Sequence, residues 1–278
     1  MHGYFASVIL PIGAIDNYLP TQLESLKRQT YNQPFEIVLS LNCDIQVNKP
    51  LLERLCSDAE IHATIVDSSQ SRGAAFARNI GARASSGRAL VFCDADDLAD
   101  PDWLREILLG LETADAVGGY LEEALLTDPR TLSYRPPATP GENPTFMGFP
   151  YLVSANMAIS RDAFDAVGGF PEGYTRCEDI AFSWALLRAG HTLGFRKEAV
   201  MHYRYRSGLS TMLKQHFYYG IGMSEVLARD GLPTGEQAGA KLLKGNNQSP
   251  RVRSLMNTLR RGSIASGRVA GLIKERRK

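Results

Sequence analysis

The sequence predicts an α/β fold with a central, mostly parallel sheet and a helical segment at its C-terminal end. Short apolar runs alternate with segments of helical periodicity through the first 120 residues, a spacing typical of parallel strands joined by helices. The 278 residues, 44% hydrophobic and 22% charged, suffice for one large domain or two small ones. In such a fold, ligands gather at the carboxyl ends of the strands.

The elements of the first half follow in order. The apolar runs that we expect to be buried strands are 6–10, 35–41, 61–66, 88–93 and 116–120. Apolar residues three or four positions apart predict helices around 19–26, 51–55, 74–84 and 104–111. Pro101 can begin the last of these helices, because a first-turn proline loses no helical hydrogen bond.

Prolines change the pattern in the middle of the chain. Six of them between residues 127 and 150 break regular structure, so we expect a long loop that crosses to a second half. Beyond the loop we predict a strand at 152–159, a helix at 161–167 ended by Gly168 and Gly169, and a helix at 180–189. From Gly208 onward we expect mostly helix.

Charge is distributed unevenly along the chain. The net charge is +1, which does not indicate a nucleic-acid-binding protein. Residues 251–278 nevertheless carry +8, and the first 250 residues carry −7. The basic segment can be a peripheral membrane helix with Leu and Val on one face, or a solvated, disordered tail.

The cysteines and the N-terminus bear on location. Cys43, Cys56, Cys93 and Cys177 form no C-x-x-C pair, as is typical of buried thiols in a reducing cytoplasm. The first residues lack a basic start and a cleavage site, so we expect no signal peptide. No apolar run approaches the roughly 20 residues that span a bilayer. We therefore expect a cytoplasmic protein, with the basic tail available for contact at the inner face of the membrane.

Three aspartates directly follow the apolar run 89–93. Asp94, Asp96 and Asp97 are like charges that resist leaving water, so a partner is expected to offset their repulsion. Mg²⁺ and Mn²⁺ prefer oxygen ligands and are often held by one or two carboxylates together with a diphosphate. We interpret Asp94 and Asp96 as such ligands, and Asp97 and Asp100 as a helix cap and solvated surface acids.

Several ordered stretches carry a family resemblance. In order, they are "SVILP", "FEIVLSLN", "RGAAFARNIGARASSGRALVFCDADD", "NMAISRDAFDAVGGF" and "CEDIAFSWALLRAG". Together they resemble the inverting family 2 glycosyltransferases of the GT-A fold over residues 6–205. The resemblance implies a GT-A catalytic domain at 1–210, with a nucleotide-binding half at 1–120 and an acceptor-binding half at 121–210. Residues 211–278 are then a C-terminal helical extension with the basic tail.

The resemblance also implies roles for individual residues. Asp96 would bind the metal, and Asp94, next to Ala95, would contact the ribose or the waters of the metal. The segments that line the nucleotide pocket would contribute Pro11, Asn42, Arg72, Gly73 and Arg78. Asn156, Gly168 and Gly169 would lie near the donor sugar and the acceptor. Asp179 falls where the family keeps its general base, with Glu178 orienting a neighbour or the acceptor. His202 would contact the metal or the diphosphate.

The residues support Asp179 independently of the resemblance. An inverting transfer needs one base to take the proton of the acceptor hydroxyl, and a metal-bound diphosphate leaves without an acid. Glu178 and Asp179 begin a predicted helix, where the helix dipole favours acids. Structural acids are common at that position, so the position alone leaves both readings open. Arg204 and Arg206 alternate with tyrosines and can reach phosphate oxygens or lie on a solvated strand.

The expected activity is transfer of a sugar from a nucleotide-diphosphate sugar to a hydroxyl of a glycan, lipid-linked sugar or small molecule, with Mn²⁺ or Mg²⁺. "IGAID" and "LNCD" depart from the family pattern after the first two strands, so UDP, dTDP and GDP sugars all stay open. One alternative is a sugar-phosphate nucleotidyltransferase, which usually has a Gly-rich loop and a basic residue after the first strand. A non-catalytic nucleotide-sugar-binding protein is the other. A dinucleotide enzyme would need G-x-G-x-x-G, which is absent.

Overall fold

The computed structural model describes residues 5–233 and 251–275. Its main sheet has eight strands in the order β3-β2-β1-β4-β9-β6-β10-β5. Their bounds are β1 Ala6–Ile12, β2 Phe35–Leu41, β3 Ala63–Asp67, β4 Ala89–Cys93, β5 Leu98–Ala99, β6 Ala116–Glu122, β9 Asn156–Ser160 and β10 Leu193–His202. Strands β3, β2, β1 and β4 run parallel to one another, and β6 runs parallel to β10. Strands β9 and β5 run antiparallel to their neighbours.

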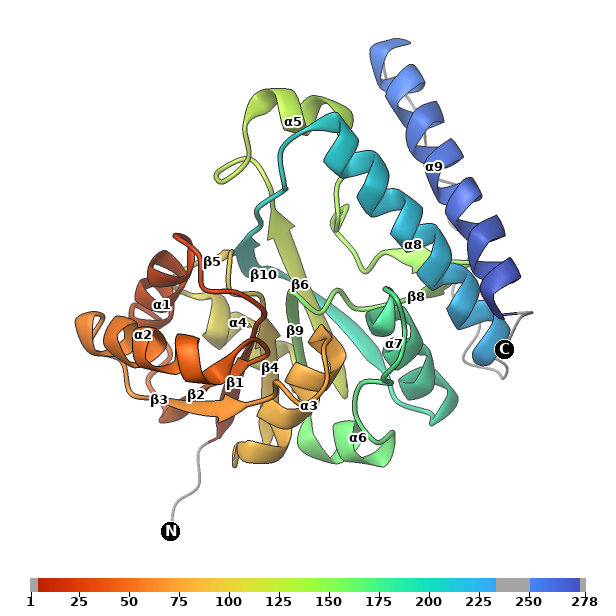
Figure 1. Ribbon diagram of the computed structural model, residues 1–278. Helices are drawn as coiled ribbons and strands as arrows, with labels where there is room; N and C mark the ends of the chain where they lie inside the picture. Colours follow the sequence, from red (N-terminus) through yellow and green to blue (C-terminus); the bar gives the residue numbers. More distant parts are fainter. Residues whose placement is uncertain (1–4, 234–250, 276–278) are drawn as a thin grey trace.

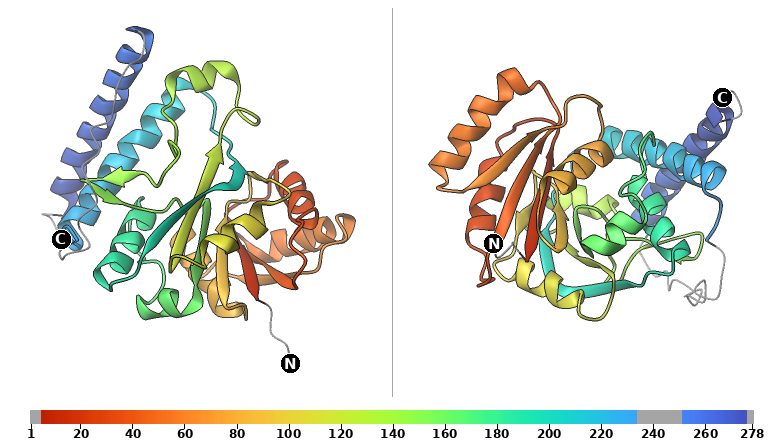
Figure 2. Two further views of the ribbon diagram at one scale, coloured as in Figure 1. Left: turned by 180° about the vertical axis from the view of Figure 1, so that it is seen from behind. Right: turned by 90° about the horizontal axis from the view of Figure 1, so that it is seen from below.

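Helices cover both faces of this sheet (Figures 1 and 2). One face carries α1 Leu19–Lys27, α2 Ile45–Asp58 and α4 Trp103–Gly110, and the other carries α3 Ala74–Ala84, α6 Arg161–Ala166 and α7 Glu178–Arg188. Successive side chains of β1 point to opposite faces of the sheet, and an apolar core lies on each face. Val8 and Leu10 pack against the first group of helices, and Ile9 between them packs against the second. The predicted α/β class and its mostly parallel sheet are confirmed.

The prediction of a long loop at 127–150 is wrong in part. It contains a short helix, α5 Pro129–Tyr134, and a hairpin of β7 Thr145–Phe146 and β8 Phe149–Pro150. Asp128 caps α5 by accepting from the backbone N–H of Thr131 at 2.9 Å, and Pro129 occupies the first turn, where proline is tolerated. The strand predicted at 152–159 begins only at Asn156, because Ser154 and Ala155 directly before it form a turn.

The C-terminal part is helical, as predicted. Helix α8 spans Leu209–Arg229 and α9 spans Arg251–Glu275, and the two lie side by side at one edge of the molecule (Figure 1). Val226 of α8 shares an apolar cluster with Ile180 and Trp184 of α7. Among the described residues, no helix is long and apolar enough to cross a membrane.

Candidate active site

The acidic cluster lies just beyond the carboxyl end of β4. One carboxylate oxygen from each of Asp94, Asp96 and Asp97 lies within 4.8 Å of the others. Asp97 is only 1% exposed, so our interpretation of it as a solvated surface acid is wrong. Its Oδ1 accepts the backbone N–H of Arg204 at 2.9 Å, and its buried Oδ2 has no partner.

Burial and mutual repulsion set the electrostatics of this cluster. Burial, and then the charge of Asp94, raise the pKa of Asp96. Burial, with Asp94 and Asp96, raises the pKa of Asp97 well above its usual range. An all-oxygen donor set with one unpartnered buried oxygen fits a hard divalent cation, which would offset the repulsion. Asp96, with Asp94 beside it, is placed to hold such an ion.

Arg78 connects this cluster to the start of α7. It comes from α3, is 3% exposed, and donates from Nη2 to Asp94 Oδ1 at 2.8 Å and from Nη1 to Glu178 Oε1 at 3.2 Å. Burial opposes its charge, but Asp94 and Glu178 outweigh that effect and raise the pKa of Arg78. These two ion pairs make the side chain a bridge between acids, and the nucleotide contact that we expect of Arg78 stays a prediction.

Asp179 and Glu178 occupy the first turn of α7, as predicted. Burial first, and then the charge of Glu178, raise the pKa of Asp179 to about 7, although the backbone N–H of Ile180 and the charge of Arg78 act in the opposite direction. A carboxylate with this pKa holds and releases a proton near neutral pH. Arg78 therefore joins two acidic groups of different chemistry, one suited to a cation and one suited to a proton.

Tyrosines around these acids were missed at the sequence level. Burial, and then the charge of Asp179, raise the pKa of Tyr151, and the same two causes raise the pKa of Tyr219 to about 12. Burial, and then the nearby charges of Tyr219, Asp97 and Asp94, raise the pKa of Tyr203 well above its usual range. No local signal distinguishes these tyrosines from core residues, because they come from three separate segments that only the fold brings together.

Four of the expected nucleotide-pocket residues lie at the same sheet edge as the cluster. Asn42, after β2, donates to the carbonyls of Ser68 and Ser71, and its Oδ1 accepts from the N–H of Gly73 at 2.9 Å. Gly73 has φ +138°, which glycine adopts readily, and directly precedes α3. Pro11 lies near the end of β1, and Arg72 is exposed. Asn42 thus fixes the loop that presents Arg72 and Gly73.

The side chain of Asn156 is hydrogen-bonded within the core, and its expected place near the donor sugar and the acceptor stays a prediction. It is 1% exposed; its Oδ1 accepts from Trp103 Nε1 at 2.8 Å, and its Nδ2 donates to the carbonyls of Tyr120 and Ala199 at 3.0 and 2.9 Å. Both amide hydrogens are used within the protein. Gly168 and Gly169 end α6 with φ +77° and +79°, and a Cβ on Gly169 would lie 2.7 Å from Asn79 Oδ1.

His202 is not in the acidic cluster. Its Nδ1 lies 2.9 Å from Glu122 Oε2, and its Nε2 lies 4.0 Å from Asp100 Oδ2. His202 is therefore not part of the group of three aspartates, and its expected contact with the metal or the diphosphate stays a prediction. Arg204 is closer to the cluster: its Nε donates to the carbonyl of Asp96 at 3.0 Å, and its guanidinium carbon lies 3.8 Å from the ring centre of Tyr18.

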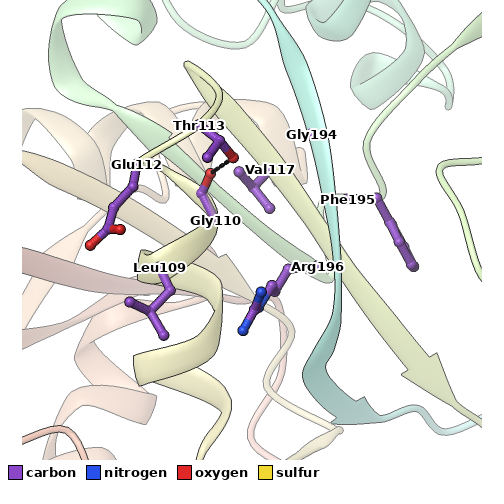
Figure 3. A pocket seen from close by; sticks show the side chains of 8 residues that line it. All are labelled: Leu109, Gly110, Glu112, Thr113, Val117, Gly194, Phe195 and Arg196. Carbon is purple, nitrogen blue, oxygen red and sulfur yellow. Dashed lines mark hydrogen bonds between the residues drawn. The ribbon is translucent and has the colours of Figure 1, made fainter.

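A separate hollow of about 270 Å³ lies near the amino-terminal ends of β6 and β10 (Figure 3). It is lined by Leu109, Gly110, Glu112, Thr113, Val117, Gly194, Phe195 and Arg196. Strand β6 runs in the same direction as β4, so the hollow lies toward the amino-terminal ends of these strands and the acidic cluster toward their carboxyl ends. None of the predicted site residues lines it.

Comparison of the sequence with protein families decides the family. The model of Glycosyl transferase family 2 matches residues 7–168, more than half of the chain. This chain belongs to glycosyltransferase family 2. The predicted resemblance is confirmed, and the protein is a glycosyltransferase.

Similar proteins agree with this family. The chain is 26% identical over 241 residues to Glycosyltransferase AglE of Haloferax volcanii, covering 81% of this chain and 75% of that protein. It is 27% identical over 192 residues to an uncharacterized glycosyltransferase of Haemophilus influenzae, covering 66% and 62%. The chain thus spans less than two thirds of the second relative.

Solved structures agree with the fold. The mannosyltransferase PcManGT from Pyrobaculum calidifontis, in complex with GDP-Man and Mn²⁺, has a TM-score of 0.66 at 17% identity, covering 97% of this chain and 74% of that chain. S. aureus TarS 1-349 in complex with UDP-GlcNAc has a TM-score of 0.59 at 16% identity, covering 83% and 68%. These likenesses confirm the GT-A fold of this glycosyltransferase.

Proposed function

We propose that this glycosyltransferase moves a sugar from a nucleotide-diphosphate sugar to an acceptor hydroxyl, with a divalent metal and with inversion at the anomeric carbon. The observation that carries the proposal is the link, through the buried Arg78, between Asp94 of the Asp94–Asp96–Asp97 cluster and Glu178, which directly precedes Asp179. The pKa of Asp179 is raised to about 7. In this assignment residues 1–120 bind the donor and residues 121–210 bind the acceptor.

Asp96 would hold Mn²⁺ or Mg²⁺, with Asp94 at the ribose or at the waters of the ion. When bound, such an ion neutralises the charge of the leaving diphosphate. The loop that Asn42 fixes, with Pro11, Arg72, Gly73 and Ala95 at the same edge, is assigned to the nucleotide. His202 stays a predicted contact of the metal or the diphosphate, because Glu122 engages only Nδ1 of its ring and a carboxylate partner there is usual for a metal-ligating histidine.

Asp179 is assigned as the general base. Its carboxylate takes the proton of the acceptor hydroxyl while the hydroxyl oxygen bonds to the anomeric carbon. The bond between that carbon and the phosphate oxygen of the donor breaks in the same step, and its electron pair leaves with the nucleoside diphosphate. Because the new bond forms on the opposite face of the ring, the configuration inverts. Glu178 is assigned to hold Arg78 and to orient the acceptor.

The donor is narrowed by analogy alone. The two structural neighbours described above bind GDP-Man and UDP-GlcNAc, so GDP and UDP sugars are the first candidates, with dTDP sugars next. The acceptor class stays a saccharide or a lipid-linked sugar.

A thermal-shift panel tests the donor site. UDP, GDP, dTDP, ADP and CDP are each added with and without Mn²⁺ or Mg²⁺, because a ligand of the folded state raises its stability by mass action. We expect one diphosphate to give a metal-dependent shift that Asp96→Ala abolishes and Asp179→Asn keeps. If no diphosphate shifts the wild type, or if Asp96→Ala responds like the wild type, the proposed site is wrong.

We also assign a peripheral membrane contact to the outer face of α9. Val269 is 59% exposed, Leu272 and Ile273 are exposed beside it, and residues 251–278 carry a net charge of +8. The acid of the segment, Glu275, pairs instead with Arg229. We expect co-sedimentation with phosphatidylglycerol vesicles but not with phosphatidylcholine vesicles, and loss of it in Val269→Glu. Equal binding of the variant would contradict the assignment.

A further inference from the structure

The segment that leads into the base is held by helices from the far end of the chain. Residues 173–177 precede α7 without regular structure, and Cys177 has φ +67°, which is uncommon for a residue with a side chain. The carbonyl of Gly173 accepts from Arg229 of α8 at 3.0 Å, and Gly222 of α8 lies so close to the carbonyl of Arg176 that no Cβ would fit there. The direction in which Asp179 enters α7 therefore depends on α8.

Glu225 is the centre of this support. It is 0% exposed, and its carboxylate accepts the backbone N–H and the hydroxyl of Thr175, both at 2.7 Å. Lys274 of α9 donates to it at 2.6 Å and to the Thr175 hydroxyl at 2.9 Å. Burial alone would raise the pKa of Glu225, but these hydrogen bonds outweigh it and lower the pKa. A buried carboxylate with matched donors fixes geometry well, because each donor would lose a strong bond by moving.

Close backbone contact sets the position of Lys274. A Cβ on Gly267 of α9 would collide with the carbonyl of Phe217, and one on Gly220 of α8 would collide with the carbonyl of Ile264. Ser224 also donates to the carbonyl of Arg268 at 3.0 Å. The two helices therefore meet in one register, which brings the ammonium of Lys274 to Glu225.

We infer that α8 and α9 act as a clamp that positions the catalytic base, with Glu225, Thr175 and Lys274 as positioning residues. The inference rests on the proposed role of Asp179. The clamp holds segment 173–177 and through it the first turn of α7, while the donor-side cluster after β4 has no contact with Lys274. Loosening the clamp should slow the step that needs Asp179 without weakening the binding of the nucleotide.

The test compares Lys274→Met with Arg261→Met, a matched loss of one positive charge at an exposed position of the same helix. The activity is release of nucleoside diphosphate from GDP-mannose or UDP-GlcNAc with Mn²⁺, whichever the wild type hydrolyses. We expect about tenfold lower kcat in Lys274→Met with an unchanged Kd for the diphosphate, because small displacements of a reacting group cost rate. Arg261→Met should match the wild type. Equal kcat in both variants would overturn the clamp.

Two further measurements separate the clamp from a loss of folding and from a failure of the proposed function. Hydrogen exchange on folded Lys274→Met should be faster at residues 173–180 and unchanged at 89–97; protection at 173–180 equal to that of the wild type overturns the inference. Glu225→Gln combined with Lys274→Met removes the unpaired buried charge and should recover part of the kcat. If Asp179→Asn retains full activity, the proposed base is wrong, whatever the clamp variants do.

Discussion

Two buried charged side chains hold the start of α7 from opposite sides, and they differ in what they touch. Arg78 reaches Glu178 from the sheet side and also binds Asp94, so it belongs to the chemistry of the donor site. Glu225 reaches Thr175 from the C-terminal helices and touches no residue of the acidic cluster. Removing Arg78 should therefore affect binding, rate and folding together, whereas loosening the contacts of Glu225 should lower the rate and the stability but leave the binding of the diphosphate unchanged.

Arg78→Met gives the largest effect in this comparison. It leaves Asp94 and Glu178 without their buried partner, and breaking a buried ion pair in this way costs about 3 kcal/mol of unfolding free energy. We expect this loss in urea denaturation, together with weaker metal-dependent binding of the diphosphate. Arg78→Lys should recover part of the stability, because it keeps the charge but not both bonds. A stability and affinity equal to those of the wild type would remove Arg78 from the site.

The pH dependence of the rate and of the stability tests the raised pKa of Asp179, the neighbour of Glu178 in the first turn of α7. Burial raises the pKa of Asp179 to about 7, so the rate should rise with pH up to about 7 and then level off, since a base acts when deprotonated. The same shift lowers stability as pH rises from about 4 to about 7, because only the unfolded chain ionises freely there. Asp179→Asn should then be more stable than the wild type at pH 8, on the order of 4 kcal/mol, and equal at pH 4. Equal stability at both pH values would contradict the raised pKa.

Asn156→Ala adds a third case to the comparison, because Asn156 is buried but bonds neither to the Asp94–Asp96–Asp97 cluster nor to the acids that begin α7. Loss of its bonds to Trp103, Tyr120 and Ala199 leaves buried polar groups unpaired, which costs about 2 kcal/mol. We expect a lower melting temperature with an unchanged Kd for the diphosphate. A specific loss of donor turnover at full stability would instead support the sugar contact that the family resemblance implies for Asn156.

The sequence predicts what depends on neighbouring residues. The bounds of α3, of β2 and of the start of α7 follow from local periodicity, and the aspartates after β4 follow from their place at a strand end. Asp97 was misjudged because its burial depends on Arg204, which lies 107 positions away. The bridge from Arg78 to Glu178 spans 100 positions, so no local pattern could show it.

The C-terminal half was harder to predict for the same reason. The helices after Gly208 were expected, but their role was not, because Thr175, Glu225 and Lys274 meet only after α8 and α9 have packed against each other. Glycines that permit this packing look like helix breakers in the sequence. Prolines between 127 and 150 likewise concealed α5, since a proline at the start of a helix is tolerated.

Turnover by Asp179→Asn tests the central assignment most directly. Release of nucleoside diphosphate from GDP-mannose and from UDP-GlcNAc is measured with Mn²⁺ for the wild type and this variant, alongside diphosphate binding. We predict release by the wild type from at least one donor, about a thousandfold loss in Asp179→Asn, and an unchanged Kd, because amide and carboxylate have the same shape but only the carboxylate accepts the proton. Full turnover by Asp179→Asn would contradict the account.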